Sequence, residues 1–522
     1  MKNIFKDEKK YLVALALILV ARIVLHILLY KSGFESLSAD EFGRIVRAAH
    51  WTQNLHLIWY GPWLPFHTYL FGTALRIVWD LLYVPRMIAV LFGLVSIVLM
   101  YFYASRIFKN TKVGLVGALL LAVNPAHIWL SSVPLTEIIH TALILAVMLL
   151  FINYLRTGRL VTLFLSTLLL SIANGFRFEA WMFTVVYSLY LGFLAISKFF
   201  SKESSLNQVV LILGAAALPW IFPIVWIVSD FSHTGQILHF MSSVKTYKLK
   251  WYGDTRSYFS YWRTFISLDS FSTVAGVIGL VYSTYKYWCS KAVKYAALMA
   301  VIPFLLFVGT HAGQIEPLAN YIRYLASFQF LLIPFAAFLL LDLTMKIIHT
   351  RKYQTYSIAL LLIAYSITQI HAAFNFQYYP GKDPSSQGLL PGLQLKSMRE
   401  ANADLAQRPI LLELSYWEYL AFHVGANDIS TILYDREFGF LNRGSKSIIS
   451  ENFKALQYCI LSHNIGLIVV KSPELKDTIR FELQVQPFEE FNGYAFFHIL
   501  EGSKPGDELE QNTCPLNYNS GY

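Results

Sequence analysis

Long apolar runs recur through most of the chain and constrain its fold more than any other feature. A helix needs about 20 apolar residues to cross a bilayer. Eleven segments approach that length: residues 11–30, 84–103, 113–130, 135–155, 161–172, 180–196, 209–228, 271–287, 294–308, 324–343 and 356–370. Charged residues form only 14% of the sequence, well below the roughly one quarter typical of soluble domains. We therefore predict a polytopic α-helical membrane protein with about 11 transmembrane helices.

Lysines and arginines gather in alternate loops between these runs. Cytoplasmic loops of membrane proteins are enriched in basic residues, and this bias fits one orientation throughout the chain. The amino terminus is then inside and the carboxyl terminus outside, with major outer loops at residues 31–83 and 230–270. The net charge of +10 is explained by the basic inner loops, so no nucleic-acid partner is predicted.

The character of the sequence changes after residue 372. A Gly/Pro/Ser-rich linker at 381–386 precedes short β-type runs at 410–414, 430–434, 466–471, 481–485 and 495–500, which alternate with helical patterns at 394–407 and 452–463. Such alternation predicts an α/β domain. The predicted organisation is a transmembrane catalytic domain at 1–372, a soluble extracytoplasmic α/β domain at 373–500 and a polar tail at 501–522. The three widely spaced cysteines predict neither a metal site nor a disulfide framework.

Two adjacent acids, Asp40 and Glu41, follow the first apolar run. Phe42, Ile45 and Val46 recur behind them with helical spacing, so the acids would open an amphipathic helix along the outer membrane surface. Carboxylates at the mouth of a membrane domain are costly unless their charge is used. The alternative is a local role, in which both acids complement the dipole of the helix that they begin.

Seven short motifs occur in order along the chain: DEFGRIVRAA at residues 40–49, GPWLPFHTYL at 61–70, VPRM at 84–87, NP at 124–125, PLTE at 134–137, NGFRFE at 174–179 and YIRY at 321–324. Together they resemble motifs of the large membrane glycosyltransferases with the GT-C fold, in particular the protein O-mannosyltransferase and aminoarabinose-lipid A transferase branch. One departure is that the Pro-Pro pair of that branch is separated here into Pro62 and Pro65.

The resemblance implies transfer of a sugar from a polyprenyl-phosphate donor to an acceptor hydroxyl at the outer membrane face. It further implies that Asp40 deprotonates the acceptor and that arginines or lysines hold the lipid phosphate. The chemistry of the reaction agrees. Because phosphate is a good leaving group, the enzyme has to remove the acceptor proton and neutralise the charge that develops on the phosphate. A single displacement would invert the anomeric configuration of the sugar.

Other charged and polar residues fall near predicted outer helix ends or in outer loops. The predicted site consists of Asp40, Glu41 and Glu137 as catalytic acids, Arg86, Arg177, Arg323, Lys248 and Arg256 as donor-phosphate ligands, and His67, Tyr69 and Glu179 in the substrate cavity. Arg86 begins a helix, where the dipole disfavours a cation, and this favours a phosphate ligand. The other arginines, and the aromatic and basic segment 245–263, could instead be interfacial residues.

Two further features have both a functional and a structural interpretation. Ser131, Ser132 and Pro134 precede Glu137 in the pattern of a capped helix start, so capping is the alternative role for that acid. Arg22 and His26 lie one helical turn apart inside the first apolar run. Ionisable groups inside a membrane are functional candidates, but this pair could also lock neighbouring helices together.

Motifs of several other protein classes do not occur. The sequence contains no phosphate-binding loop and no zinc-protease motif. No cofactor is predicted besides the lipid-linked donor, although a divalent metal at the paired acids stays open. The predicted partners are membrane lipid, a polyprenyl-phosphate sugar and a protein, glycan or lipid acceptor. The lack of Asn-x-Ser/Thr sequons favours a prokaryotic plasma membrane. Two other functions stay open: a transporter or flippase of lipid-linked sugars, and a non-catalytic membrane scaffold.

Overall fold

The chain divides into two compact units in the computed structural model, which describes residues 2–61, 63–202, 205–237, 239, 241–243, 265–266, 269–311, 318–375, 384–414, 418–436, 447–451 and 453–499. The membrane unit consists of Met1–Phe34, Leu57–His67 and Arg86–Pro380. The α/β unit consists of Glu35–His56, Thr68–Pro85 and Gly381–Tyr522. The lysine and arginine predicted in the second outer loop, Lys248 and Arg256, lie outside the described residues.

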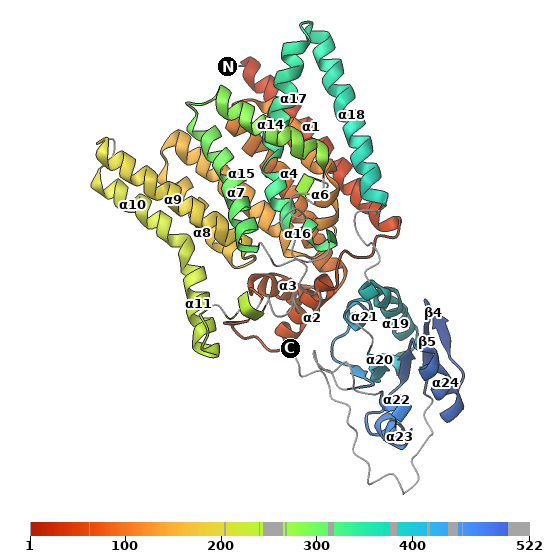
Figure 1. Ribbon diagram of the computed structural model, residues 1–522. Helices are drawn as coiled ribbons and strands as arrows, with labels where there is room; N and C mark the ends of the chain where they lie inside the picture. Colours follow the sequence, from red (N-terminus) through yellow and green to blue (C-terminus); the bar gives the residue numbers. More distant parts are fainter. Residues whose placement is uncertain are drawn as a thin grey trace. The chain divides into compact units, whose positions relative to one another are not determined.

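The membrane unit is helical (Figure 1). Its elements are α1 (Lys2–Lys31), α4 (Tyr83–Phe108), α5 (Thr111–Val123), α6 (Pro125–Leu130), α7 (Thr136–Thr157), α8 (Leu160–Asn174), α9 (Glu179–Phe200), α10 (Leu206–Ala217), η1 (Leu218–Trp220), α11 (Ile221–Thr234), α14 (Ser270–Lys286), α15 (Lys291–His311), α16 (Leu318–Phe330), α17 (Ile333–Ile347) and α18 (Arg351–Asn375). Within the unit, α7 packs against α8, α9 against α10 and α14 against α17.

Every one of the eleven apolar runs is helical, and the protein is a polytopic helical membrane protein. Over the described residues, seven helices are long and apolar enough to cross a membrane, or eight if the bent pair α16 and α17 forms one span. The difference from eleven arises because α5, α8 and α14 contain only 13, 15 and 17 residues. A count of eleven spans is therefore not confirmed.

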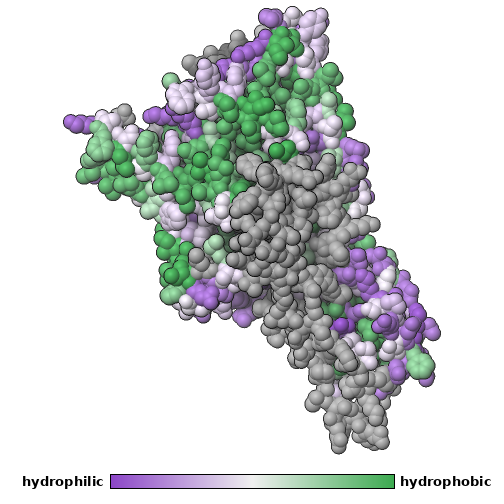
Figure 2. All heavy atoms as spheres, in the orientation of Figure 1, coloured by the Kyte–Doolittle hydropathy of each residue, from purple (hydrophilic) through white to green (hydrophobic). Residues whose placement is uncertain are grey.

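Large apolar side chains lie exposed on the helices of the membrane unit. Leu189 and Phe193 of α9 are each 70% exposed, and Val210 and Leu213 of α10 are also exposed. Figure 2 shows hydrophobic atoms gathered over the part of the molecule that contains α9 and α10. Contiguous apolar surface of this kind is unusual on a soluble protein and marks a surface that meets lipid.

Helix breaks inside the membrane unit follow from local sequence. Asn124 ends α5 and begins α6, and its side-chain oxygen accepts a hydrogen bond from the His127 N–H at 3.1 Å. Pro125 in the first turn of α6 has no N–H to leave unpaired. Similarly, Pro334 lies in the first turn of α17, which is bent by 43° from α16. These breaks allow polar residues on different helices to meet within the unit.

A five-stranded sheet forms the core of the α/β unit, in the order β2-β1-β3-β5-β4. Its strands are β1 (Ile410–Leu412), β2 (Ile432–Tyr434), β3 (Leu467–Val470), β4 (Glu489–Phe491) and β5 (Tyr494–His498). The first three are parallel, whereas β5 is antiparallel to β3 and β4. The sheet is accompanied by η2 (Pro384–Gly388), α19 (Leu389–Ala401), α20 (Ala403–Gln407), α21 (Glu418–Ala426), α22 (Ile448–Glu451), α23 (Phe453–Ser462) and α24 (Pro473–Glu482).

Three sequence-based expectations for this region are wrong. The strand predicted at 481–485 does not form, because Pro473 starts α24 and the helix continues to Glu482, while Leu475 and Ile479 bury one face of it. The helix predicted at 394–407 is two helices, because the Asn402 side chain caps α20. Finally, Cys459 is disulfide-bonded, although no disulfide framework was expected.

The first loop contributes two segments to the α/β unit. They contain α2 (Ala39–Gln53) and most of α3 (Phe66–Ile77). The amphipathic pattern after Asp40 is confirmed as a helix, since Phe42, Ile45 and Val46 are all buried. The whole of residues 31–83 was expected in the transmembrane domain, whereas these two segments are compact with the carboxyl-terminal part of the chain.

His423 of α21 makes the stability of the α/β unit depend on pH. Its ring is fully buried, with Nδ1 2.6 Å from the Asp428 carbonyl oxygen and Nε2 2.5 Å from the Tyr434 hydroxyl. Burial lowers the pKa of His423 to about 4, and repulsion from His50 adds to this effect. Between pH 6.5 and 4 the unfolded chain therefore binds a proton that the folded chain excludes.

We expect the unit to lose about 3 kcal/mol of stability as the pH falls through this window, at 1.36 kcal/mol per pKa unit. Asp428, whose pKa is lowered to about 2, adds a separate loss only below pH 3.8. Thermal unfolding of the intact protein at pH 7 and pH 5 measures the slope. His423→Gln should flatten the slope and the exposed-site control His349→Gln should not. An unchanged slope in His423→Gln would contradict this assignment.

Candidate active site

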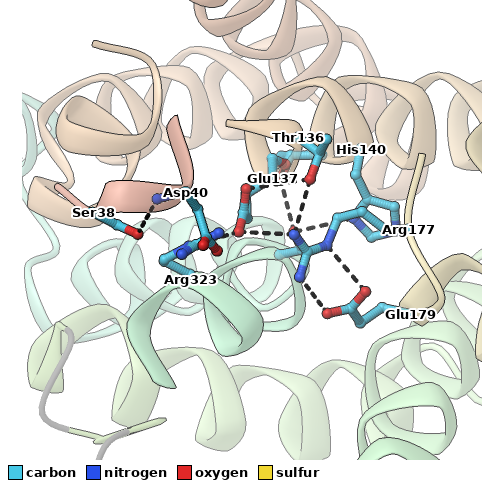
Figure 3. Close-up of polar contacts among 10 residues, drawn as sticks. Ser38, Asp40, Thr136, Glu137, His140, Arg177, Glu179 and Arg323 are labelled. Atoms are coloured by element: carbon cyan, nitrogen blue, oxygen red, sulfur yellow. Dashed lines mark hydrogen bonds and ion pairs between the residues drawn. The ribbon is translucent and has the colours of Figure 1, made fainter. Parts of the chain in front are cut away.

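Glu137 lies at the centre of a buried ionic cluster in the membrane unit. It occupies the first turn of α7 and is completely buried. Its Oε1 lies 2.7 Å from Nη1 of Arg177, which comes from the turn between α8 and α9. The same oxygen lies 2.9 Å from Nε of Arg323, on α16. Figure 3 shows both arginine side chains directed at the Glu137 carboxylate.

Arg177 joins a second acid to this cluster. Its Nε donates to Glu179 Oε2 at 3.0 Å, and its Nη2 donates to the other oxygen of Glu179. Nη1 also donates to the Thr136 hydroxyl at 3.0 Å. Burial disfavours the charged guanidinium, but Glu137 and Glu179 more than offset burial and raise the pKa of Arg177. Arg177 is therefore a permanent cation that holds two glutamates in place.

The four charged side chains of Glu137, Arg177, Glu179 and Arg323 sum to zero. Arg177 is 7% exposed and Arg323 is 3% exposed. A buried ion pair is stable when its remaining hydrogen bonds are satisfied, and removing one partner is strongly destabilising. The cluster fits a positioning role as well as it fits the phosphate-binding role predicted for the two arginines.

Neutral polar groups border the ionic cluster. The Thr141 hydroxyl donates to the Glu137 carbonyl oxygen at 2.9 Å and lies 2.9 Å from the Ser327 hydroxyl. Nδ1 of His140 lies 3.3 Å from the same Ser327 oxygen. These contacts tie α7 to α16 beside Glu137. His140, Thr141 and Ser327 could not be recognised from the sequence, because polar residues scattered inside apolar runs carry no motif.

Arg86 lies in the first turn of α4 and is only half-buried. Its guanidinium carbon lies 5.2 Å from the centre of the Tyr30 ring, on α1. The Tyr30 hydroxyl donates to the Ser132 carbonyl oxygen at 2.5 Å, in the turn that leads to α7. An arginine over an aromatic face keeps its charge. Among the predicted phosphate ligands described, Arg86 is the least buried.

The turn before Glu137 differs from its expected form. Helix α7 begins at Thr136, and its N-cap residue, Leu135, makes no side-chain capping bond. Ser131 and Ser132 instead donate to the carbonyl oxygens of His127 and Ile128 in α6. The predicted serine cap is therefore wrong, because these hydroxyls close the preceding helix.

Arg22 and His26 belong to a separate buried network. The Arg22 guanidinium donates to the carbonyl oxygens of Ala122 and His127 at 2.6 and 2.9 Å, on either side of the break between α5 and α6. His26 Nδ1 lies 2.9 Å from the Ser132 hydroxyl. Both side chains thus lock α1 to the broken helix, the structural alternative raised by the sequence.

Asp40 and Glu41 begin α2 in the α/β unit. Asp40 is half-buried, and its backbone N–H donates to the hydroxyl of the N-cap residue Ser38 at 3.1 Å. Glu41 is buried, and its Oε2 accepts the Leu37 N–H at 3.1 Å. Glu41 therefore fixes the start of the helix, as a capping acid does. The two acids differ in exposure although they are adjacent in sequence.

The two first-loop residues predicted in the substrate cavity fall in different units. His67 belongs to the membrane unit, is 1% exposed, and its Nδ1 lies 2.8 Å from the Leu64 carbonyl oxygen. Tyr69 belongs to the α/β unit, where its ring centre lies 5.3 Å from that of Trp51. Over the described part of the chain, no group of three or more His, Cys, Asp or Glu residues is placed to hold a metal ion.

Comparison with known proteins gives structural matches without sequence matches. Neither a protein-family profile nor a curated protein sequence matches the chain. ArnT from Cupriavidus metallidurans bound to undecaprenyl phosphate is similar with a TM-score of 0.58 and 12% identity, over 92% of this chain and 97% of that protein. The apo state of ArnT gives the same TM-score at 10% identity. A third similar structure is that of AglB, an oligosaccharyltransferase from Archaeoglobus fulgidus solved with an inhibitory peptide and a dolichol-phosphate. Its TM-score is 0.51 at 13% identity, over 89% of this chain and 69% of AglB.

Proposed function

Because the chain has the GT-C fold of membrane glycosyltransferases, we propose that it transfers a sugar from a polyprenyl-phosphate donor to an acceptor hydroxyl. The observation that carries the proposal is the similarity to ArnT, a protein whose structure was solved with undecaprenyl phosphate bound. The similarity extends over 92% of this chain. It includes both the membrane helices and the carboxyl-terminal region.

Asp40 is the base in this proposal. A general base has to reach the proton that it removes, and Asp40 is half-buried at the start of α2. Glu137 is completely buried and shared by two arginines, and Glu41 accepts a backbone N–H. Glu137 and Glu41 are therefore better suited to holding other groups in place than to exchanging protons.

Arg86 is the ligand of the donor phosphate in this proposal. A guanidinium binds phosphate oxygens through paired N–H groups and neutralises the charge of the leaving group. Among the predicted phosphate ligands that the structure describes, Arg86 is the least buried, and its guanidinium lies over the Tyr30 ring. Arg177 and Arg323 are assigned instead to holding Glu137 in the first turn of α7.

The disulfide of Cys459 supports placing the α/β unit outside the cytoplasm. Disulfides persist in oxidising compartments and are rare in the cytosol. Cys459 is fully buried on α23 and disulfide-bonded. This placement agrees with the orientation derived from the basic loops, and with a reaction at the outer membrane face of a prokaryotic plasma membrane.

Reconstitution with candidate donors tests the proposed function. Intact protein in liposomes is given polyprenyl-phosphate sugars and a panel of acceptor alcohols, and product formation and anomeric configuration are measured. We expect transfer with inversion, since one carboxylate base supports a single displacement. Retention of configuration would overturn the single displacement. Movement of donor across the bilayer without product would identify a transporter, and binding without either event would identify a scaffold.

A further inference from the structure

The helix that carries Asp40 is packed against the carboxyl-terminal part of the chain. Helices α2 and α21 are in contact, and both belong to the α/β unit. A Cβ atom placed on Gly43 would lie 3.4 Å from Cδ1 of Leu420, which is van der Waals contact. Leu420 is only 2% exposed. Gly43 follows Asp40 by three residues, so this contact lies within one helical turn of the proposed base.

Asn427 makes a second connection to the first loop. It follows α21 with φ of +56°, a backbone conformation that asparagine tolerates better than most residues. Its Oδ1 accepts the Leu81 N–H at 2.9 Å, and its carbonyl oxygen accepts the Trp79 Nε1–H at 3.2 Å. Lys396 of α19 adds an ion pair with Asp80 at 3.9 Å. The loop segment is thus held at three consecutive residues.

Helix α21 is itself held closely by α19. A Cβ atom on Gly425 would lie 2.3 Å from the Leu389 carbonyl oxygen, and one on Gly392 would lie 2.4 Å from the Phe422 carbonyl oxygen. Only glycine permits so close an approach of two helices. Beyond Asn427, Asp428 pairs with Arg399 of α19 at 2.6 Å. These contacts make α19 and α21 a rigid support for the two loop segments.

We propose that the α/β domain positions the catalytic base, Asp40, through two contacts. Leu420 meets α2 directly at Gly43. Asn427 acts indirectly: it holds residues 79–81, which follow α3, and α3 contacts α2 where the rings of Tyr69 and Trp51 lie 5.3 Å apart. The inference rests on the proposed function, since it assigns the proton transfer to Asp40. Leu420 and Asn427 are positioning residues that do not touch the substrate. Misplacing a catalytic group by about 1 Å can cost roughly 100-fold in rate, so loosening this support should lower kcat and leave donor binding unchanged.

Asn427→Gly is the decisive variant, because glycine keeps the positive φ and removes only the side chain. Its matched control is Asn492→Gly, an exposed asparagine with φ of +49° in the turn between β4 and β5. For Asn427→Gly we expect kcat to fall by about 10- to 100-fold, with the donor KM and the Tm unchanged. Asn492→Gly should resemble the unmodified protein. A normal kcat in Asn427→Gly, or an equal fall in both variants, would overturn the proposal.

Hydrogen exchange separates failure of this inference from failure of the proposed function. Amides of α2 should exchange faster in Asn427→Gly and in Leu420→Ala than in Asn492→Gly, whether or not a donor has been found. Absence of transfer in the unmodified protein, with this pattern of exchange intact, would contradict the proposed function alone. Unchanged exchange of α2 in Asn427→Gly and Leu420→Ala would contradict the positioning role alone.

Discussion

Glu137→Gln is expected to destabilise the protein by about 3–5 kcal/mol, the usual cost of removing one partner from a buried ion pair. Arg177 and Arg323 both bind Oε1 of this carboxylate, at 2.7 and 2.9 Å. Glutamine keeps the size and the hydrogen-bonding oxygen but removes the charge that balances the two cations. Denaturant titration of detergent-solubilised protein at pH 7 would measure the loss.

Two further variants test whether the loss comes from charge. In Glu137→Gln combined with Arg323→Gln, removal of one cation should recover part of the stability, which a double-mutant cycle would show. The control is Asp477→Asn, because Asp477 is 77% exposed and its pair with Arg480 spans 3.7 Å. Exposed pairs contribute about 0–1 kcal/mol. A loss in Glu137→Gln no larger than in Asp477→Asn would contradict the ionic role of the cluster.

Asp40→Asn is expected to reduce sugar transfer by about 100- to 10,000-fold, the usual contribution of a general base. Asparagine retains the shape of the side chain but cannot remove the proton from the hydroxyl group of the acceptor. Binding of the lipid-linked donor should persist, because the proposal assigns the donor phosphate to Arg86. Steady-state kinetics with separate titration of donor and acceptor would show a fall in kcat at a constant donor KM.

Arg86→Leu is the complementary variant. We expect it to raise the donor KM and to change kcat less than Asp40→Asn does. Glu41→Gln is the neighbouring control. Since Glu41 caps the start of α2 through the Leu37 N–H, its replacement should lower thermal stability more than it lowers kcat. Equal activity of Asp40→Asn and the unmodified protein would exclude Asp40 as the base, and a donor KM raised equally by both substitutions would contradict the division of roles.

The periodicity of the sequence was sufficient for most local structure. Apolar runs predicted helices because a bilayer offers no water to the backbone N–H and C=O groups, so these groups have to pair within their own segment. The stripe of Phe42, Ile45 and Val46 predicted α2 for the same local reason. Errors occurred where competing local signals met, as at 481–485, where α24, which starts at Pro473, extends into the first two residues of a run that resembled a strand.

Several residues of the candidate site were predictable from the sequence, but the ion pairs that they form were not. Glu137, Arg177, Glu179 and Arg323 were all candidates from the sequence, and only the structure showed that they form one cluster. Glu137 and Arg323 are 186 residues apart. Ion pairing over that separation depends on how α7 and α16 pack, and no spacing within either helix encodes it. The different burial of the adjacent acids Asp40 and Glu41 was likewise visible only in the structure.

The sequence by itself determined that this chain is a helical membrane protein with an α/β region, because hydrophobic burial and secondary structure respond to neighbouring residues. Tertiary structure alone decided that two segments of the first loop, including the one with Asp40, are compact with residues 381–499. It also decided which charged groups meet. The physical reason is that contacts between distant segments arise from the packing of whole helices, such as α2 on α21, and leave no periodic trace in either segment.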